Sequence, residues 1–172
     1  MNKKHKEKRF MKFAKTRDVK TPTRGTAASA GIDLFIPNDW TGGEPLDLQP
    51  GGNILIPSGI KVNVPAGHAL IAFNKSGVAS KKGLIVGACV IDEDYQGEVH
   101  LNVININQEF DTTRDGVYFI DSGYVKITPG EKLLQCILLP VNYAMPIEVT
   151  EENLYEEETT RGSGGFGSTG VE

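Results

Sequence analysis

The sequence predicts an all-β fold, in the form of a compact, jelly-roll-like β-barrel. The apolar runs are short, and glycine, proline or asparagine separates each run from the next, as in strands that are joined by turns. Helical periodicity is confined at most to residues 150–157. A chain of 172 residues suits one domain, because such a length buries roughly two thirds of its unfolded surface.

The first strand is predicted at residues 32–35, directly after a run of small residues. The preceding glycine suggests tight backbone packing, with the carboxylate of Asp33 directed off the strand. Residues 37–53 are rich in proline and glycine and predict a loop. Trp40, within that loop, is predicted to be a packing residue rather than a ligand platform.

Two further strands are predicted at residues 60–64 and 69–73, with a turn at residues 65–67. Residues 75–77, Lys-Ser-Gly, follow the second of these strands. They could present a cation, a hydroxyl and an amide to an anion. A plain surface turn explains the same residues equally well.

The chain is organised around residues 90–98, where an apolar strand runs into acidic residues, a tyrosine and a glycine before alternation resumes. This pattern predicts a hairpin that holds the acidic residues between two strands. On one interpretation Asp92 stands at a pocket wall and takes a proton from water. On the other, the acidic residues are only solvated turn residues.

After this stretch the apolar positions change from odd to even numbers, which predicts a β-bulge near Val103. Residues 107–123 are polar and predict an inserted loop or hairpin. Further strands are predicted at residues 117–120, 125–127 and 133–139. Gln135 interrupts the last, near-continuous apolar run, and its amide is either satisfied in the core or faces a site.

The formal charge is −4, and because the first ten residues carry +4, the rest of the chain carries −8. An acidic body argues against a nucleic-acid groove, and the basic residues 1–10 are expected to be a disordered tail. No segment is apolar over the length that a bilayer requires, and no apolar stretch follows the N-terminal charges as in a secretory signal. The sequence therefore predicts an intracellular, cytoplasmic protein.

Two cysteines, Cys89 and Cys136, lie in apolar, strand-like sequence without close spacing. This arrangement predicts two buried free thiols in a reducing compartment, rather than a disulfide or a metal site. The three histidines lack the spacing of metal ligands, so none is predicted to bind zinc.

The C-terminal residues 151–172 begin as an acidic linker and end in a glycine-rich segment. A disordered tail is one interpretation. A mobile lid is the other, because an arginine, an aromatic ring, hydroxyls and unobstructed amides suit a phosphorylated aromatic ligand. These groups belong to Arg161, Phe166, Ser168 and Thr169.

Five separated segments, in order, resemble the five motifs of the trimeric dUTP diphosphatase (dUTPase) family. They read AGIDL, KSGVA followed by GL, VIDEDYQGE, PGEKLLQ and RGSGGFGSTG, and they span residues 30–170. The third and fifth segments are highly specific, whereas the first and fourth are weak alone. Five in order are very hard to obtain by chance.

The resemblance implies a jelly-roll domain at residues 11–150 and a flexible C-terminal arm with a lid. It further implies a homotrimer with shared active sites that hydrolyses dUTP to dUMP and diphosphate. Mg²⁺ would be the cofactor, held by the triphosphate oxygens and waters without a direct protein ligand. Such an enzyme limits uracil incorporation into DNA and supplies dUMP for thymidylate synthesis.

The resemblance also implies residue roles. Asp92 would be the general base for water attack at the α-phosphate, Tyr95 would pack on the deoxyribose, and Asp33 would support the phosphate end indirectly. The backbone from Gly87 to Val90 would hydrogen-bond uracil. The phosphates would be met by Lys75, Ser76, Gly77 and Gln135, and the lid that closes over the nucleotide would use Arg161, Phe166, Gly167, Ser168 and Thr169.

The sequence also departs from the family pattern. Lys75 and Lys132 stand where arginine is usual, and lysine cannot reproduce the bidentate fork of a guanidinium. Ile32 replaces a frequent tyrosine, and Leu134 replaces a frequent alanine. The connection at residues 111–122 is longer than usual, either as decoration or as a surface for a regulatory protein.

There are two rival functions, one that is enzymatic and one that is not. A dCTP deaminase resembles this fold, but residues 91–95 and the complete lid favour diphosphate hydrolysis. A non-catalytic jelly-roll binding protein is disfavoured because the base, the sugar-packing tyrosine and the lid are present together.

Overall fold

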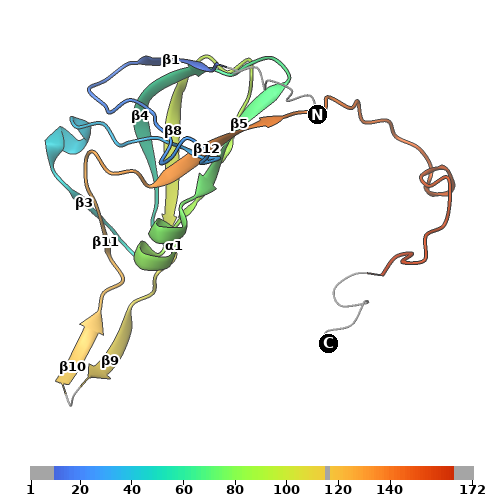
Figure 1. The fold of residues 1–172 in the computed structure, drawn as a ribbon. Helices are drawn as coiled ribbons and strands as arrows, with labels where there is room; N and C mark the ends of the chain where they lie inside the picture. Colours follow the sequence, from blue (N-terminus) through green and yellow to red (C-terminus); the bar gives the residue numbers. More distant parts are fainter. Residues whose placement is uncertain (1–9, 115–116, 165–172) are drawn as a thin grey trace, which may run out of the picture. The chain divides into compact units, whose positions relative to one another are not determined.

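The computed structural model describes residues 10–114 and 117–164, with residues 110–121 described by their backbone alone. The chain divides into two compact units, Met1–Asn142 and Tyr143–Glu172. In the described part of the first unit, the strands form two four-stranded sheets and two strand pairs (Figure 1). The predicted all-β class is confirmed, with open sheets rather than a closed ring of strands.

The first sheet has the strand order β1-β4-β8-β6, and its neighbours are antiparallel. Its strands are β1 (Lys12–Lys15), β4 (Asn53–Asn63), β8 (Glu98–Asn105) and β6 (Leu84–Val86). Along β8, Val99, Leu101 and Val103 are buried and the residues between them are more exposed. This period of two is that of a strand with one face on the core.

The second sheet has the order β2-β12-β5-β7, again antiparallel. Its strands are β2 (Ile32–Asp33), β12 (Leu134–Pro140), β5 (His68–Asn74) and β7 (Val90–Ile91). β12 pairs with β5 along its whole length. The strand predicted at residues 133–139 is therefore confirmed.

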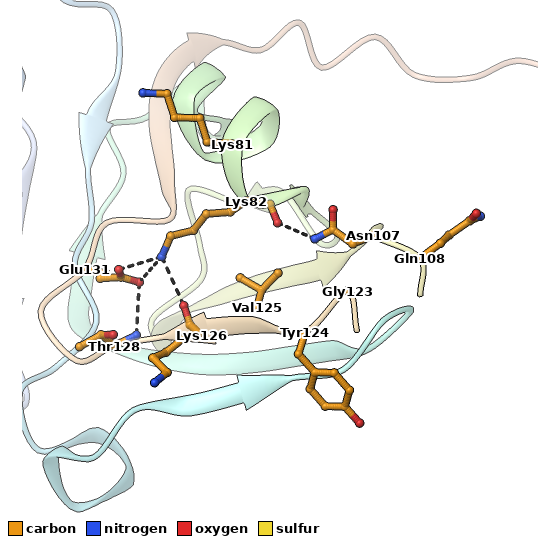
Figure 2. Close-up of a pocket in the computed structure, with 10 residues that line it drawn as sticks. All are labelled: Lys81, Lys82, Asn107, Gln108, Gly123, Tyr124, Val125, Lys126, Thr128 and Glu131. Atoms are coloured by element: carbon orange, nitrogen blue, oxygen red, sulfur yellow. Dashed lines mark hydrogen bonds and ion pairs between the residues drawn. The ribbon is translucent and has the colours of Figure 1, made fainter. Parts of the chain in front are cut away.

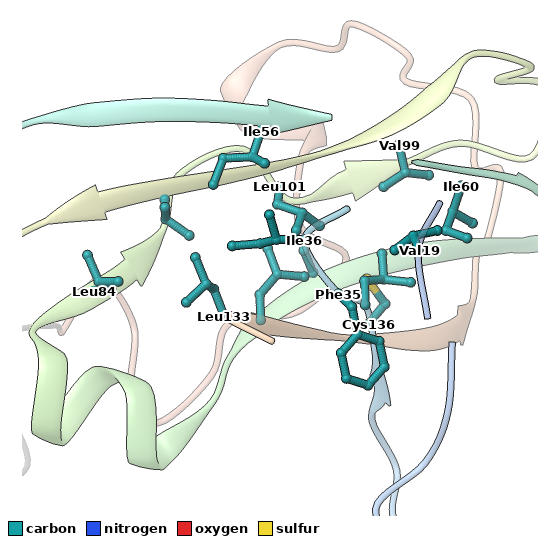
Figure 3. Packing of buried hydrophobic residues seen from close by; sticks show 14 of the residues in the cluster. Val19, Phe35, Ile36, Ile56, Ile60, Leu84, Val99, Leu101, Leu133 and Cys136 are labelled. Carbon is teal, nitrogen blue, oxygen red and sulfur yellow. The ribbon is translucent and has the colours of Figure 1, made fainter. Parts of the chain in front are cut away.

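The hydrophobic core lies between these two sheets. Figure 3 shows Ile56 and Leu101 of the first sheet above Ile36 and Cys136, which lie toward the second. Ile36, Ile56 and Leu101 have no exposed surface. A core packed in this way holds the loops that join the sheets on a rigid support.

Two strand pairs complete the unit. β3 (Leu46–Leu48) pairs with β11 (Val125–Ile127), and β9 (Phe110–Arg114) pairs with β10 (Val117–Asp121). The predicted inserted hairpin is therefore confirmed, whereas the region predicted to be only a loop contains β3 and the 3-10 helix η1 (Trp40–Gly43). Trp40 packs partly buried against the core, as predicted.

One short helix was not predicted. It is α1 (Ser76–Lys82), and it ends at Gly83, which adopts a φ of 63°. Seven residues are too few for a periodic pattern to be distinguished from a turn. The expected helical pattern near residue 150 is only the 3-10 helix η2 (Glu151–Asn153) of the second unit. No helix in the described ranges is long and apolar enough to cross a membrane.

The strand irregularity lies on β4 rather than near Val103. The pairing register between β4 and β8 shifts between Pro57 and Lys61. Gly59 occupies this shift with a φ of 70°, a conformation that glycine adopts without steric cost.

The alternation of buried and exposed residues along β8 does not change. Its last inward-facing residue is simply polar. Asn105 is fully buried, and its amide donates to the carbonyl oxygens of Leu48 and Gly123, both at 2.9 Å. Ile106, the next apolar residue, is 54% exposed. The predicted bulge near Val103 was wrong, since it assumed that only apolar residues point inward.

Candidate active site

The acidic stretch at residues 90–98 crosses between the sheets. β7 pairs with β5 through Val90 and Ile91, whereas β8 pairs with β4 and β6. Strands therefore flank the acidic residues as predicted, but the two strands do not pair with each other as a hairpin. Alternation identifies a strand without identifying its partner, so this crossing could not be read from the pattern.

Several hydrogen bonds hold the turn between β7 and β8, which carries the acidic residues. The Tyr95 hydroxyl donates to the Glu98 carbonyl oxygen at 2.9 Å, and the Glu98 side chain accepts a hydrogen bond from the Gly59 N–H at 2.6 Å. The Glu93 carboxylate accepts from the Gly67 N–H. These contacts place the exposed Asp92 carboxylate on a backbone that is held on both sides.

A pocket of about 200 Å³ lies beside this turn. Val90 and Tyr95 are 59% and 44% exposed there. The lining residues are Leu55, Ala88, Cys89, Val90, Ile91, Asp92, Tyr95, Val99 and His100. The structure thus brings the predicted base, the predicted sugar-packing ring and part of the predicted uracil-reading backbone to one pocket.

A second group of predicted residues gathers around Asp33. The side chain of Asp33 is 4% exposed, and each carboxylate oxygen accepts from a different lysine: Lys75 at 2.5 Å and Lys132 at 2.7 Å. Burial alone would raise the pKa of Asp33, but the hydrogen bonds and charges of Lys132 and Lys75 outweigh it and hold the pKa below its ordinary value. Asp33 therefore remains a carboxylate between two cations.

We expect Asp33→Asn to lower the free energy of unfolding at pH 7 by on the order of 2 kcal/mol, because both ammonium groups lose a charged acceptor. The lowered pKa means that Asp33 stabilises the fold above its unfolded pKa of about 3.9, and that this stabilisation is lost as pH falls below that value. Urea unfolding at pH 7 and pH 3 measures both effects, and the difference between variant and parent should shrink at pH 3. Asp47→Asn, on the exposed side of β3, is the control; equal midpoints for Asp33→Asn and the parent at pH 7 would contradict the prediction.

Gln135 and α1 complete this second group. The Gln135 side chain donates to the Asn74 carbonyl oxygen at 3.0 Å, and a Cβ on Gly31 would lie 2.1 Å from its amide oxygen. Gly31 is therefore needed for the space that Gln135 occupies. A Cβ on Gly77, in contrast, would meet nothing within 4 Å, so the space around this glycine is open.

β5 separates the two groups. Ile91, next to Asp92, pairs with Leu70, whereas Ser76 follows the far end of β5 beyond Asn74. The strand between Leu70 and Asn74 spans about 13 Å at roughly 3.3 Å a residue. A single chain therefore holds the predicted base and the predicted phosphate contacts at separate places.

The predicted lid is described only at its start. Arg161, in the second unit, donates from Nε to the Gly164 carbonyl oxygen at 2.9 Å. The other lid residues, Phe166, Gly167, Ser168 and Thr169, lie outside the described residues.

A larger pocket, of about 480 Å³, contains none of the predicted site residues. Figure 2 shows Lys82 reaching across it to both carboxylate oxygens of Glu131, at 2.8 and 2.9 Å. Lys82 also accepts at its carbonyl oxygen from Asn107. These contacts tie the end of α1 to the neighbouring turns.

The two cysteines differ from each other. Cys136 is buried as predicted, and its burial raises the pKa of its thiol to about 12. Cys89 is exposed in the pocket beside Asp92, so its predicted burial was wrong. It lies in the connection between β6 and β7, whose apolar residues do not face the core.

We expect only Cys89 to react rapidly with the thiol reagent DTNB in the folded protein at pH 8. The thiolate is the form that reacts. Burial of Cys136 disfavours its thiolate and also blocks access of the reagent. Absorbance should report one fast thiol per chain when folded and both thiols in denaturant, and Cys89→Ser should abolish the fast phase. Comparable rates for both cysteines would contradict the structure.

The described residues were predicted to bind no metal ion directly. They contain no group of three or more His, Cys, Asp or Glu side chains that could hold a metal ion. Asp33 already serves two lysines. A cation bound directly by several protein ligands does not fit these residues, whereas one that arrives on a ligand's own phosphates requires none.

A family model and the curated relatives of this chain point to the same family. A family model described as dUTPase matches residues 17–170. The deoxyuridine 5'-triphosphate nucleotidohydrolase of Chlamydia pneumoniae is 38% identical over 152 residues, which cover 87% of this chain and 90% of that protein. The enzyme of the same name from Maricaulis maris is 36% identical over 157 residues, which cover 87% of each chain.

Solved structures of phage proteins share the fold. A dUTPase of Staphylococcus bacteriophage 80alpha, solved with dUpNHpp, has a TM-score of 0.75 at 24% identity and covers 95% of this chain and 100% of its own. The dUTPase from phage phi11 of S. aureus, described with a species-specific insert, has a TM-score of 0.68 at 22% identity and covers 86% of this chain and 100% of its own. This likeness confirms the predicted dUTPase-like β fold.

Proposed function

Because the chain belongs to the dUTPase family, we propose that it hydrolyses dUTP to dUMP and diphosphate. The observation that carries the proposal is the exposed Asp92 carboxylate at the wall of a pocket that it shares with Tyr95. A carboxylate held beside a ligand-sized recess can accept a proton from a bound water. In the cell, this reaction would limit uracil incorporation into DNA and supply dUMP for thymidylate synthesis.

In the proposed reaction Asp92 is the general base. It takes one proton from a water molecule while the water oxygen bonds to the α-phosphorus. The bond from that phosphorus to the oxygen bridging the α- and β-phosphates breaks, and diphosphate leaves with the bonding electrons. The fastened turn supports this role, because a base must stay within hydrogen-bond reach of its water.

Uracil and deoxyribose occupy the pocket beside Asp92 in this proposal. The backbone from Gly87 to Val90 reads the base, and the ring of Tyr95 packs on the sugar. The hydrogen bond from Tyr95 to the Glu98 carbonyl oxygen supports a fixed ring. A fixed ring leaves no room for the 2′-hydroxyl of a ribonucleotide.

The phosphates meet the second group of residues. Lys75, Ser76 and Gln135 supply a cation, a hydroxyl and an amide, and Gly77 allows close approach because the space around it is open. Magnesium on the triphosphate would neutralise charge on the phosphate oxygens. The lid residues Arg161 and 166–169 then close over the nucleotide.

We also propose that each site is shared between chains of a homotrimer. Asp92 and Ser76 of one chain are separated by most of β5, so a site with both groups at one triphosphate is incomplete without a second copy. Exposed apolar side chains that follow β12 in the sequence support association between chains. Met145, Ile147 and Val149 are 85%, 82% and 48% exposed.

Diphosphate release from a panel of nucleoside triphosphates tests the proposed function. We expect turnover of dUTP in Mg²⁺, with UTP, dCTP and dTTP poorer by at least about 100-fold, the scale at which a pocket discriminates against a substrate that differs by one small group. Ammonia released from dCTP would indicate the deaminase instead. Absence of turnover with every nucleotide would favour a binding protein, for which the hairpin of β9 and β10 is a candidate regulatory surface.

A further inference from the structure

The connection between β6 and β7, residues 87–89, crosses from one sheet to the other outside any strand. Asn102 on β8 holds its beginning: the Gly87 N–H donates to the Asn102 carbonyl oxygen at 3.1 Å, and the Ala88 N–H donates to Asn102 Oδ1 at 2.8 Å. The end is held by the second sheet, where the Ala72 N–H donates to the Cys89 carbonyl oxygen at 2.7 Å.

The side chain of Asn102 is itself fixed. Its Nδ2 donates to Asn53 Oδ1 at 2.7 Å and to the Ile54 carbonyl oxygen at 3.2 Å. The Ile54 carbonyl can only accept and the Ala88 N–H can only donate, so the orientation of the amide is determined by its partners. Asn102 therefore links β4 to the connection through one rigid group.

Gly87 is fitted to this amide. A Cβ on Gly87 would lie 1.8 Å from Asn102 Oδ1, while Gly87 does not have a positive φ. The glycine is therefore required for space rather than for backbone conformation. Asn102 and Gly87 act as a pair: the amide occupies the volume that a side chain would need.

We propose that Asn102 is a positioning residue that sets the base-reading backbone of residues 87–90 and so determines the preference for uracil. The inference rests on the proposed function, because it assigns a base to this pocket. A backbone N–H and C=O read a base edge only when they are placed to within about 0.5 Å, and an error of 1 Å can cost roughly 100-fold. Asn102 holds the first two residues of this backbone, Gly87 through its main-chain carbonyl oxygen and Ala88 through its side-chain amide.

The principal test is Asn102→Ala in the full-length protein. We expect the KM for dUTP and the Kd for dUMP to rise at least tenfold, because dUMP retains the base while lacking the β- and γ-phosphates. We expect kcat to stay within about threefold, because the turn that carries Asp92 and Tyr95 is held by separate hydrogen bonds, from the Gly67 N–H to Glu93 and from the Tyr95 hydroxyl to the Glu98 carbonyl oxygen. The ratio of kcat/KM for dUTP over dCTP should fall at least tenfold.

Two further variants separate positioning from general stability. Asn53→Ala removes one of the two acceptors that fix the amide, so it should raise the same KM in the same direction but by less, about threefold. Asn107→Ala also loses two amide hydrogen bonds, to Lys82 and Asn105, but at the far end of β8, and should leave KM and base preference unchanged. Thermal unfolding and oligomer size check that each variant is folded, and if Asn102→Ala does not fold, Asn53→Ala carries the test.

The following outcomes would overturn the positioning role of Asn102 or the proposed function on which it rests. Asn102→Ala with KM and base ratio within twofold of the parent overturns the positioning role, as does a fall in kcat alone with unchanged base preference. If Asn102→Ala cannot be folded, an unchanged KM in Asn53→Ala overturns it. A parent protein that neither turns over dUTP nor binds dUMP overturns the proposed function, and that outcome is visible before any variant is made.

Discussion

Asp92→Asn should leave a folded protein whose turnover of dUTP falls by roughly 100- to 10,000-fold, the usual contribution of a general base. The amide keeps the shape of the side chain but cannot accept the proton of the attacking water. The turn itself should persist, because Glu93, Tyr95 and Glu98 make its fastening hydrogen bonds. Binding of dUMP should therefore survive, so that the loss appears in kcat rather than in KM.

The matched control for this variant is Asp94→Asn, in the same exposed turn. It removes the same charge from nearly the same place, and turnover should stay within about threefold, because a screened surface charge contributes little. Equal losses in both variants would mean that the negative charge of the turn matters, not a base at position 92. Turnover by Asp92→Asn within threefold of the parent would remove Asp92 from the proposed role.

Much of the fold could be predicted because burial leaves a period of two in the sequence. The strand at residues 125–127 was predicted from this alternation and the strand at residues 133–139 from a near-continuous apolar run, and β11 and β12 lie there. The bulge was misplaced because Asn105 points into the core, where its amide donates to two carbonyl oxygens. The sequence shows only that residue 105 is polar and does not show that its amide has buried partners. Strand partners were likewise hidden, since the pattern of β7 and β8 is the same whether they pair or lie in different sheets.

The motifs suggested which residues belong to the candidate site but not how those residues are arranged. Asp92 and Tyr95 meet at one pocket, and Lys75 lies by Asp33, but nothing in the motifs shows that β5 separates these groups. Asn102 was not singled out at all. It appears in the sequence as one polar residue among alternating apolar ones, and only its hydrogen bonds distinguish it from a solvated side chain.

The two lysines that depart from the family pattern are explained together by Asp33. Each carboxylate oxygen has its own ammonium group, so the carboxylate is satisfied without the bidentate fork of a guanidinium. One aspartate between two lysines leaves one net positive charge. That charge lies next to Ser76 and Gly77, where the proposed function requires neutralisation of phosphate.

Truncation after Thr160 should lower dUTP turnover on the order of 100-fold while leaving oligomer size and much of the affinity for dUMP intact. The removed residues 161–172 contain the proposed lid, and without it water exclusion and phosphate placement are lost. Ordering residues 161–170 costs roughly 1 kcal/mol of backbone entropy per residue. Charge-assisted contacts from Arg161, amide and hydroxyl contacts, and stacking by Phe166 must together offset this cost. Because several of these contacts are to phosphates that dUMP lacks, the loss should be larger for dUTP than for dUMP. Truncation after Gly170, which keeps the lid, is the control.

Mixing two inactive proteins tests whether the lid acts across subunits. The truncated chain keeps Asp92 but lacks the lid, and Asp92→Asn keeps the lid but lacks the base. If sites are shared, mixed trimers contain sites that pair an intact Asp92 with a lid donated by another chain, and activity should return when subunits exchange. Differently tagged chains establish the exchange independently of activity. Exchange without any recovery would show that each lid serves its own chain, and the shared-site arrangement would then fail for this protein even if the hydrolysis of dUTP itself is observed.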